Sequence, residues 1–365
     1  MRATKGQSAG ESQLNLEKLM SFGNTLNAPA AAIADPWPVR VFHKIPILGS
    51  GPTSIFAPHA TPAHDIDSLS VFVLSITLVI FLIVAGLLLY ALVRYRRRPG
   101  DSQMEPVQLY GSNQIEIAWT VIPFLIVVVL FLTSARVNFV TERAARPANS
   151  LEVVVIGHQF WWEYRYPKLG IVTANELHIP ASDPKAPTPT YLTMTSADVD
   201  HSFWVPELAG KMDLIPNKVN VMWIDPSKPG IYLGQCAQFC GAEHAMMLLR
   251  VYVDTPEQFA QWVASQKKPA TEDASVAEGK KVFEHTACIN CHRVTGTVAT
   301  GQFGPDLTHL ASRDTIAAGV EKNTPDNLRK WIDDPDSMKM GSLMPKMHLN
   351  NHELDAVTAY MASLR

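Results

Sequence analysis

The sequence predicts a membrane protein of three folded parts: a hairpin of two transmembrane helices, an all-β domain and an all-α domain. The chain has 365 residues, more than a single domain usually contains. Two segments are almost purely apolar, although only 47% of all residues are hydrophobic. Between residues 151 and 253 the sequence has short β-type runs, whereas the segments after residue 253 show helical periodicity.

Each apolar segment is long enough to cross a bilayer, which takes a helix of about 20 residues. Residues 68–93 contain no charge, and residues 115–135 contain only Glu116, at the edge, and one internal proline, Pro123. Four arginines open the loop between the segments, namely Arg94, Arg96, Arg97 and Arg98. By the positive-inside rule this loop is cytoplasmic. We therefore expect a multi-pass protein of the bacterial cytoplasmic membrane, with both soluble domains on the periplasmic or external face.

Changes in composition set the expected domain boundaries. The parts are an N-terminal tail at 1–65, the transmembrane hairpin at 66–145, the β domain at 146–268 and the helical domain at 269–365. The tail lacks the apolar core of a signal peptide, so we expect it to be mobile, with a short interfacial stretch around 39–48. The net charge of −3 and the lack of a long basic run with interleaved aromatics argue against nucleic acid as a partner.

The β-type runs alternate apolar and polar residues and are separated by Pro, Gly and Asp, which favours an antiparallel sandwich or barrel. A helix should follow, because Thr255 is a candidate N-cap and Pro256 suits a first turn. Residues 267–275 are polar and contain a proline, as expected of a linker. In the last domain the periodicity is clearest at 327–334 and 353–364.

All four cysteines lie in two short motifs, and the second is Cys288-Ile-Asn-Cys291-His292. This is the attachment signature of a c-type haem, in which two thioethers anchor the porphyrin and the histidine ligates iron. A local disulfide or half of a zinc site is the alternative. Methionine is the expected sixth ligand. Among Met338, Met340, Met344 and Met347 we favour Met344, which lies in a helix-breaking Gly-Ser-Leu-Met-Pro stretch, with Met347 second.

The other motif places Cys236, Cys240, His244 and Met247 within twelve residues. A disulfide would leave the histidine and methionine unexplained, and zinc makes no use of a thioether. Thiolate, imidazole and a weak thioether are the ligands of copper electron-transfer sites, and two thiolates can bridge two copper ions. A dinuclear centre needs a second histidine from elsewhere. We favour His201, which follows a predicted strand, over His158, which lies beside aromatics.

The ordered set GHQFWWEYRY, DVDHSFWVP, KMDLIPNKVN and GQCAQFCGAEHAMM, after a two-helix anchor, resembles subunit II of the haem-copper cytochrome oxidases. The appended haem domain makes the chain similar to the caa-type members. The resemblance implies a cupredoxin-like fold for the β domain and a dinuclear copper centre, CuA. The implied copper ligands are His201, Cys236, the backbone carbonyl of Gln238, Cys240, His244 and Met247.

The chain departs from the family pattern at two positions. At the position of Gln238 the family has an acidic residue that helps to hold magnesium at the interface with the large subunit. An amide is a neutral and weaker ligand, so the sequence does not decide whether magnesium binds here. Relatives that take electrons from free cytochrome c have a tryptophan at Phe160, followed here by Trp161. We expect electrons to enter through the tethered haem instead.

Two carboxylates have roles implied by the resemblance and ordinary alternatives. Asp198 matches an acidic position on the docking face of the copper domain, or is a carboxylate at a turn or strand end. Glu116 matches the entrance of a proton pathway into the large subunit, or is a solvated charge at a helix start. The two interpretations of Glu116 have equal weight.

The expected function is that of the electron-input subunit of a terminal respiratory oxidase. An upstream donor, cytochrome c or a cytochrome complex, reduces haem c, which reduces CuA. The partner, haem-copper oxidase subunit I with the other oxidase subunits, then reduces oxygen to water and is expected to pump protons. The alternatives are a subunit of a CuA-containing nitric-oxide reductase and a membrane-anchored electron shuttle.

Overall fold

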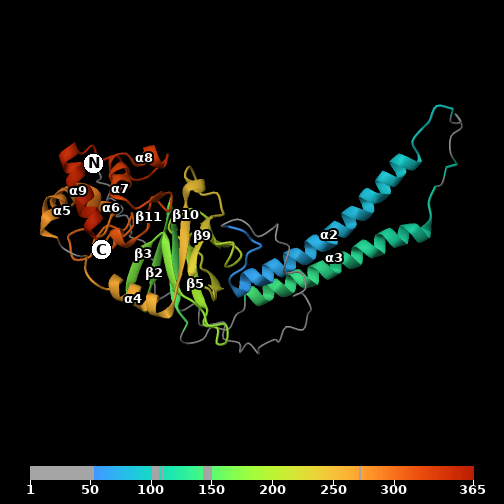
Figure 1. Cartoon of the computed structure of the whole chain (residues 1–365), viewed down its shortest axis with the longest axis horizontal. Helices are drawn as coiled ribbons and strands as arrows, with labels where there is room; N and C mark the ends of the chain where they lie inside the picture. The colour runs from blue at the N-terminus through green and yellow to red at the C-terminus, as the bar shows by residue number, and fades with distance from the viewer. Residues whose placement is uncertain (1–52, 101–106, 109, 143–149, 271–272) are drawn as a thin grey trace, which may run out of the picture.

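The computed structural model describes residues 53–100, 107–108, 110–142, 150–270 and 273–365. Figure 1 shows two long helices side by side as an arm, a β-sheet domain at their base and a helical domain on the far side of the sheets. The three-part architecture expected from the sequence is confirmed. Most of the tail, including the interfacial stretch expected around 39–48, lies outside the described residues.

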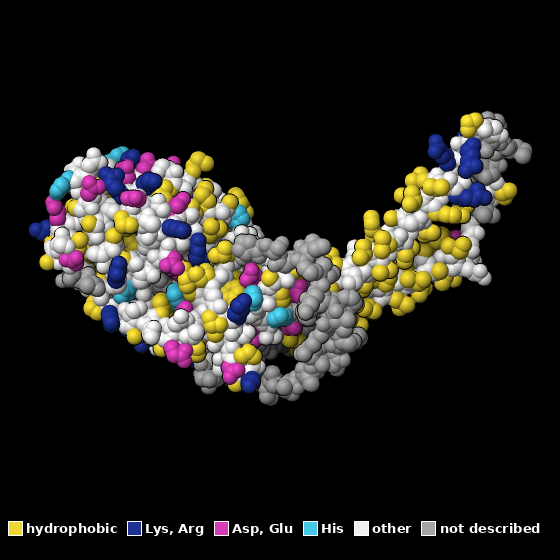
Figure 2. Space-filling model, viewed as in Figure 1, with side chains coloured by type: hydrophobic (Ala, Val, Ile, Leu, Met, Phe, Trp, Pro, Cys, Tyr) yellow, Lys and Arg dark blue, Asp and Glu magenta, His cyan; other side chains and the backbone are white. Residues whose placement is uncertain are grey.

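The arm consists of α2 (Thr61–Arg94) and α3 (Asn113–Glu142). Both helices are long and apolar enough to cross a membrane by length and composition. Apolar side chains such as Phe81, Leu87 and Phe131 are more than 60% exposed, far more than a water-facing helix would show. Figure 2 shows this apolar surface along the arm, with Lys and Arg side chains gathered at its distal tip. The apolar surface of the arm therefore suits contact with lipid.

Both helices extend beyond the apolar segments. The start of α2 and the end of α3 are joined to the β domain by hydrogen bonds. The backbone N–H and the hydroxyl of Thr61 donate to the carboxylate of Asp225 at 2.8 and 2.6 Å. The indole N–H of Trp223 donates to the carbonyl of Thr141 at 2.7 Å. The first helix begins at Thr61 rather than Ser68, because Pro62 suits its first turn and the residues around it are buried against the β domain.

The β domain is a sandwich of two five-stranded sheets. One sheet has the order β3-β2-β1-β5-β8 and the other β4-β10-β9-β6-β7. The strands of the first sheet are β1 (Glu152–His158), β2 (Trp161–Tyr166), β3 (Ile171–Ala174), β5 (Thr190–Ser196) and β8 (Asn220–Ile224). Those of the second are β4 (Glu176–Pro180), β6 (His201–Trp204), β7 (Met212–Leu214), β9 (Gly230–Cys236) and β10 (Leu248–Asp254).

The sandwich is mixed, where the sequence favoured an antiparallel arrangement. Strand β1 pairs parallel with β5, and β10 pairs parallel with β4. The chain first passes from one sheet to the other between β3 and β4, at Asn175, whose φ is 63°. Alternation of apolar residues predicts which face of a strand is buried but not its direction in the sheet.

The helical domain follows α4 (Pro256–Gln266), which begins with a complete capping box between Thr255 and Gln258. Its elements are η4 (Ala274–Val276), α5 (Ala277–His285), α6 (Cys288–Cys291), η5 (Leu310–Ser312), β11 (Thr315–Ile316), β12 (Glu321–Lys322), α7 (Pro325–Asp333), α8 (Pro335–Met338) and α9 (Asn351–Ser363). Helices α5 and α9 cross at Gly279, where a Cβ atom would lie 1.9 Å from the carbonyl oxygen of Ala356. Only glycine allows this close approach.

The helical domain rests on the edge of the second sheet through polar contacts. The buried carboxylate of Glu176 on β4 accepts hydrogen bonds from the backbone N–H of Asp314 at 3.1 Å and of Thr315 at 2.9 Å. The guanidinium of Arg250 on β10 donates to the carbonyl of Gly319 at 3.1 Å. The hydroxyl of Tyr252 donates to the carboxylate of Asp314 at 2.7 Å. The loop between η5 and β12 is thereby fixed to the β domain.

Candidate metal and haem sites

The first candidate site lies at one end of the second sheet, where two adjacent strands begin and end. Cys236 is the last residue of β9, and His201 is the first residue of the neighbouring β6. The loop from β9 to β10 contains Cys240, His244 in the short helix η3 (His244–Met246), and Met247 directly before β10. The chain thus brings the predicted histidine of one strand to the sulfur-rich loop of another.

The donor atoms of this site form one cluster. The two Sγ atoms, of Cys236 and Cys240, lie 3.9 Å apart. Around the first, the Nδ1 of His201 is at 3.9 Å and the carbonyl oxygen of Gln238 at 3.2 Å. Around the second, the Nδ1 of His244 is at 3.7 Å and the Sδ of Met247 at 3.8 Å. All six predicted copper ligands therefore meet at one place.

These separations fit metal ions held between the sulfurs. A disulfide would need sulfurs about 2.05 Å apart, so the cysteines are free thiols. Metal–ligand bonds of about 2.0–2.3 Å put neighbouring ligands of a tetrahedral ion about 3.5 Å apart. His201 and both cysteines are buried, and their ligand atoms all lie within 4.8 Å of one another. The donor set, two thiols, two imidazoles, a thioether and a carbonyl, suits copper.

The two cysteine thiols titrate as a pair. The hydrogen bond between Cys236 and Cys240 lowers the pKa of Cys236. The same hydrogen bond, together with burial, raises the pKa of Cys240. Two adjacent thiolates in this buried place repel each other, so both are stable only with a cation between them.

The carboxylate of Asp198 contacts the ring nitrogen of His201 that faces away from Cys236. Its Oδ1 lies 2.8 Å from the Nε2 of His201, which directs the Nδ1 toward Cys236. The Oδ2 of Asp198 accepts a hydrogen bond from the backbone N–H of Gln159 at 2.6 Å. Burial would raise the pKa of Asp198, but the hydrogen bonds from His201 and the backbone outweigh it and lower that pKa. The carboxylate is thus placed to orient the histidine.

His158, the alternative candidate for the second histidine ligand, contacts Glu163 and Trp161. Its Nε2 lies 2.9 Å from the Oε2 of Glu163, and its ring stacks on Trp161 with centroids 4.2 Å apart. The geometry favours His201, in agreement with the choice made from the sequence.

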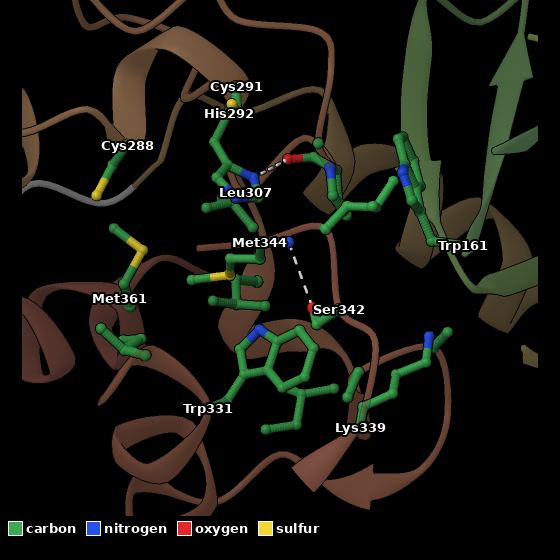
Figure 3. Close-up of a pocket in the computed structure, with 18 of the residues that line it drawn as sticks. Trp161, Cys288, Cys291, His292, Leu307, Trp331, Lys339, Ser342, Met344 and Met361 are labelled. Carbon is green, nitrogen blue, oxygen red and sulfur yellow. Dashed lines mark hydrogen bonds between the residues drawn. The ribbon is translucent and has the colours of Figure 1, made fainter. Parts of the chain in front are cut away.

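The second candidate site is a cavity of about 260 Å³ around the haem-attachment motif. Cys288, Cys291 and His292 line one part of it, and Met344 and Met347 another. Figure 3 shows the Met344 sulfur pointing into the space between His292 and Trp331. The Nδ1 of His292 lies 2.9 Å from the carbonyl oxygen of Pro305, an arrangement that leaves Nε2 free for a metal.

The residues around this cavity fit a covalent haem. Both cysteines are free thiols on one short helix, α6, with the histidine directly after it. Burial is the main cause that lowers the pKa of His292, so the imidazole is kept neutral as a ligand must be. Of the other methionines, Met340 is 73% exposed and Met338 packs against the core of the helical domain. Of the four candidate ligands, Met344 and Met347 are therefore the two that line the cavity.

The wall of the haem cavity is partly made by the β domain. Phe160 and Trp161 line it, and Trp161 packs with Ala318 of the helical domain. Figure 3 shows Trp161 entering from a strand of the β domain. Next to them, the Nε2 of Gln159 donates to the carbonyl oxygen of Cys240 at 2.7 Å. The two predicted sites therefore share one wall.

Sequence reasoning missed the residues that join the two domains. Lys339 and Glu243 form an ion pair of 2.9 Å, with both side chains no more than 3% exposed. Burial is the largest cause that raises the pKa of Glu243 and lowers that of Lys339, while the ion pair opposes both shifts. Lys339 lies outside the motifs quoted above, and Glu243 lies within GQCAQFCGAEHAMM but was not singled out.

Glu116 lies in the first turn of α3, exposed, at the end of the arm that carries the arginines. This position is compatible with both interpretations of Glu116.

An apolar helical hairpin, a β sandwich with a buried copper-type donor set and a helical domain whose cavity contains a haem-attachment motif define a membrane-anchored electron-transfer protein. Three family models match the chain: "Cytochrome C oxidase subunit II, transmembrane domain" at residues 52–137, "Cytochrome C oxidase subunit II, periplasmic domain" at 185–253 and "Cytochrome c" at 276–365. The chain belongs to the cytochrome c oxidase subunit 2 family and carries a C-terminal cytochrome c domain.

Curated relatives have the same name and nearly the same extent. "Cytochrome c oxidase subunit 2" of Alkalihalophilus pseudofirmus is 33% identical, over 84% of this chain and 89% of the relative. That of Bacillus sp. (strain PS3) is 34% identical, over 74% of this chain and 80% of the relative. The crystal structure of the periplasmic domain of subunit II from Bradyrhizobium japonicum is 29% identical, covering 34% of this chain and 97% of that one with a TM-score of 0.31.

Proposed function

We propose that this subunit takes electrons in at a haem c bound by its C-terminal domain and passes them to a dinuclear copper centre in its β domain. From there they continue to a partner oxidase subunit. The observation that supports this order most strongly is the shared wall: Phe160 and Trp161 line the haem cavity, and their neighbour Gln159 hydrogen-bonds to Cys240. Family membership supplies the context of an oxygen-reducing oxidase.

Each group of residues has a defined task in this proposal. Two thiolates, the imidazoles of His201 and His244, Met247 and the carbonyl of Gln238 would hold two copper ions. Cys288, Cys291, His292 and Met344 would hold haem c. When bound, both groups supply one-electron redox chemistry. A rigid buried donor set keeps the ligands in place when the charge changes, which keeps the energetic cost of each transfer small.

The remaining assignments concern the membrane and the partners. We place the arginine-rich tip of the arm in the cytoplasm and both soluble domains outside, as the positive-inside rule requires. A donor of the cytochrome type supplies the electrons, and the haem-copper subunit I receives them. Glu116, at the cytoplasmic end of α3, is then placed to serve proton uptake by that subunit. With Gln238 in place of a carboxylate, any magnesium at the subunit interface is held weakly.

The proposed centres can be tested on the oxidised full chain, purified in detergent with copper and iron quantified. Electron paramagnetic resonance should show a copper signal split by two equivalent nuclei, with two coppers and one haem per chain. A single-nucleus copper signal, or zinc in place of copper, would refute the dinuclear centre. A haem that is extracted by acidic organic solvent would refute covalent attachment.

A further inference from the structure

The contact between the two soluble domains contains a buried ion pair beside the copper-ligand loop. Lys339 follows α8 in the helical domain, and Glu243 directly precedes His244 in the β domain. Their charged groups are 2.9 Å apart, with exposures of 3% and 2%. The Nζ of Lys339 also donates to the carbonyl oxygen of Phe160 at 2.8 Å, 179 positions away in the chain. One ammonium group thus contacts both β-domain segments that separate the two sites.

The backbone beside this ion pair is shaped for close contact. Gly341 has a φ of +97°, and a Cβ atom on it would lie 2.9 Å from the Cβ of Ala242. Its N–H donates to the Oδ1 of Asp336 at 2.6 Å, so the bend is supported from within the helical domain. The segment continues to Met344, the favoured axial ligand. The same short segment therefore touches the copper-ligand loop at one end and the haem cavity at the other.

A buried ion pair of this kind fixes the relative position of the two domains more than it adds to the stability of their contact. Moving two charges out of water costs several kcal/mol per ion in proteins, and the attraction between them roughly offsets this cost. A displaced docking arrangement would leave each charge buried without its partner, which is strongly unfavourable. The second contact area, where Glu176 binds Asp314 and Thr315, lies on other strands. The two soluble domains are therefore joined at two separate contact areas.

We propose that Lys339 and Glu243 are positioning residues that lock the cytochrome domain onto the copper-ligand loop, so that transfer takes place in one fixed arrangement. This inference rests on the proposed function. In a locked arrangement the transfer rate depends on a constant distance. Without the ion pair, the cytochrome domain can move about the segment after α4. The rate of each electron transfer is then limited by how often the domain returns to its docked position.

The test uses the full chain with its metals and haem, in four forms: unchanged, Lys339→Met, Glu243→Gln and the double variant. Methionine keeps the length of the lysine stem, and glutamine keeps the shape of the glutamate. The matched control is Lys168→Met, which breaks the exposed ion pair with Glu152, 3.2 Å long and within the β domain. Hydrogen exchange of peptides 240–246 and 336–345 reports docking without any electron transfer. Flash reduction of the haem reports the rate of transfer to copper.

For Lys339→Met we expect exchange in both peptides to accelerate and transfer to slow by about tenfold or more, since small displacements of reacting groups cost this much. The haem spectrum and copper resonance should stay unchanged, and Lys168→Met should resemble the unchanged protein. The double variant should lose no more than the worse single variant, because no buried charge is left unpaired.

Unchanged exchange and unchanged transfer in Lys339→Met would overturn the inference, as would additive losses in the double variant. Slower transfer with an altered copper resonance would also overturn it, since the effect would then act on His244 directly. If Lys339→Met does not fold, Glu243→Gln answers the same question. Absence of haem-to-copper transfer in the unchanged protein would refute the proposed function, while the exchange comparison would still decide whether the ion pair locks the domains.

Discussion

Asp198 contacts a predicted copper ligand without being a predicted ligand itself. Its carboxylate lies 2.8 Å from the Nε2 of His201, and its other oxygen holds the backbone of Gln159. Without the carboxylate, the imidazole can rotate and change its tautomer. We predict that Asp198→Ala lowers copper affinity by about 10- to 100-fold, the usual effect of losing such a partner. Competition with a copper chelator, followed by the copper resonance, measures this; affinity equal to that of the unchanged protein would contradict it.

The identity of the sixth haem ligand can be decided by two matched variants. Met344 and Met347 both line the cavity, and Figure 3 shows the sulfur of Met344 directed into it. Methionine ligation raises the potential of a haem that has one histidine ligand. We predict that Met344→Leu lowers the haem potential and abolishes the sulfur-to-iron absorption band, while Met347→Leu preserves both. The reverse result would make Met347 the ligand.

At the residue scale, the sequence was sufficient where the chemistry of a side chain is distinctive. Cysteine, histidine and methionine at short spacing predicted two metal sites, and the choice of His201 over His158 agrees with the geometry. It was insufficient where a role depends on the folded geometry. Asp198 was expected on a docking face or at a turn or strand end, and the sequence did not show that its carboxylate contacts His201. Lys339 carried no sequence signal at all.

At the scale of elements, the crossing of α5 and α9 depends on one missing side chain. A Cβ atom on Gly279 would lie 1.9 Å from the carbonyl oxygen of Ala356, which is backbone and cannot rotate away. We predict that Gly279→Ala separates the helices and destabilises the helical domain by about 3 kcal/mol, the upper part of the usual range for overpacking. Urea unfolding followed by helical circular dichroism measures this. A loss below about 0.5 kcal/mol, typical of surface substitutions, would contradict the packing.

Strand β2 contributes a pH dependence through Glu163, which is 5% exposed. Burial would raise its pKa, but hydrogen bonds from His158 and Arg165 outweigh burial and lower the pKa below the ordinary 4.5. Because the folded-state pKa is depressed, Glu163 stabilises the fold fully above about pH 4.5, and this contribution is lost as the pH falls through the folded-state pKa. Glu163→Gln should therefore flatten the fall in stability below pH 4.5. An identical acid profile in both proteins would contradict this.

The elements themselves were largely predictable. Apolar length predicted both spanning helices, and the Thr255 cap predicted the start of α4. The parallel pairs β1 with β5 and β4 with β10 were not predicted, because strand direction depends on where the chain changes sheets. Asn175, where the chain passes from β3 to β4, is an ordinary turn residue and does not indicate in the sequence that the chain changes sheets there.

At the scale of the whole molecule, the arm, the copper domain and the haem domain form a continuous series. Thr61 and Trp223 tie the arm to the β domain, and Glu176, Arg250 and Lys339 tie the β domain to the helical domain. Fixed contacts at both junctions suit electron transfer, which needs constant distances between sites. The order of domains was predictable from the motifs, whereas the docking of the two soluble domains was not, because its contacts join residues far apart in sequence.

The most direct test of the account is the order in which the two centres are reduced. The oxidised full chain is mixed with a one-electron donor, and haem and copper absorption are followed separately. We predict that haem is reduced first and that copper then gains its electron at a rate independent of protein concentration. In Cys288→Ala, Cys291→Ala protein without haem, copper should be reduced much more slowly. Copper reduction at the same rate with and without the haem would contradict the account.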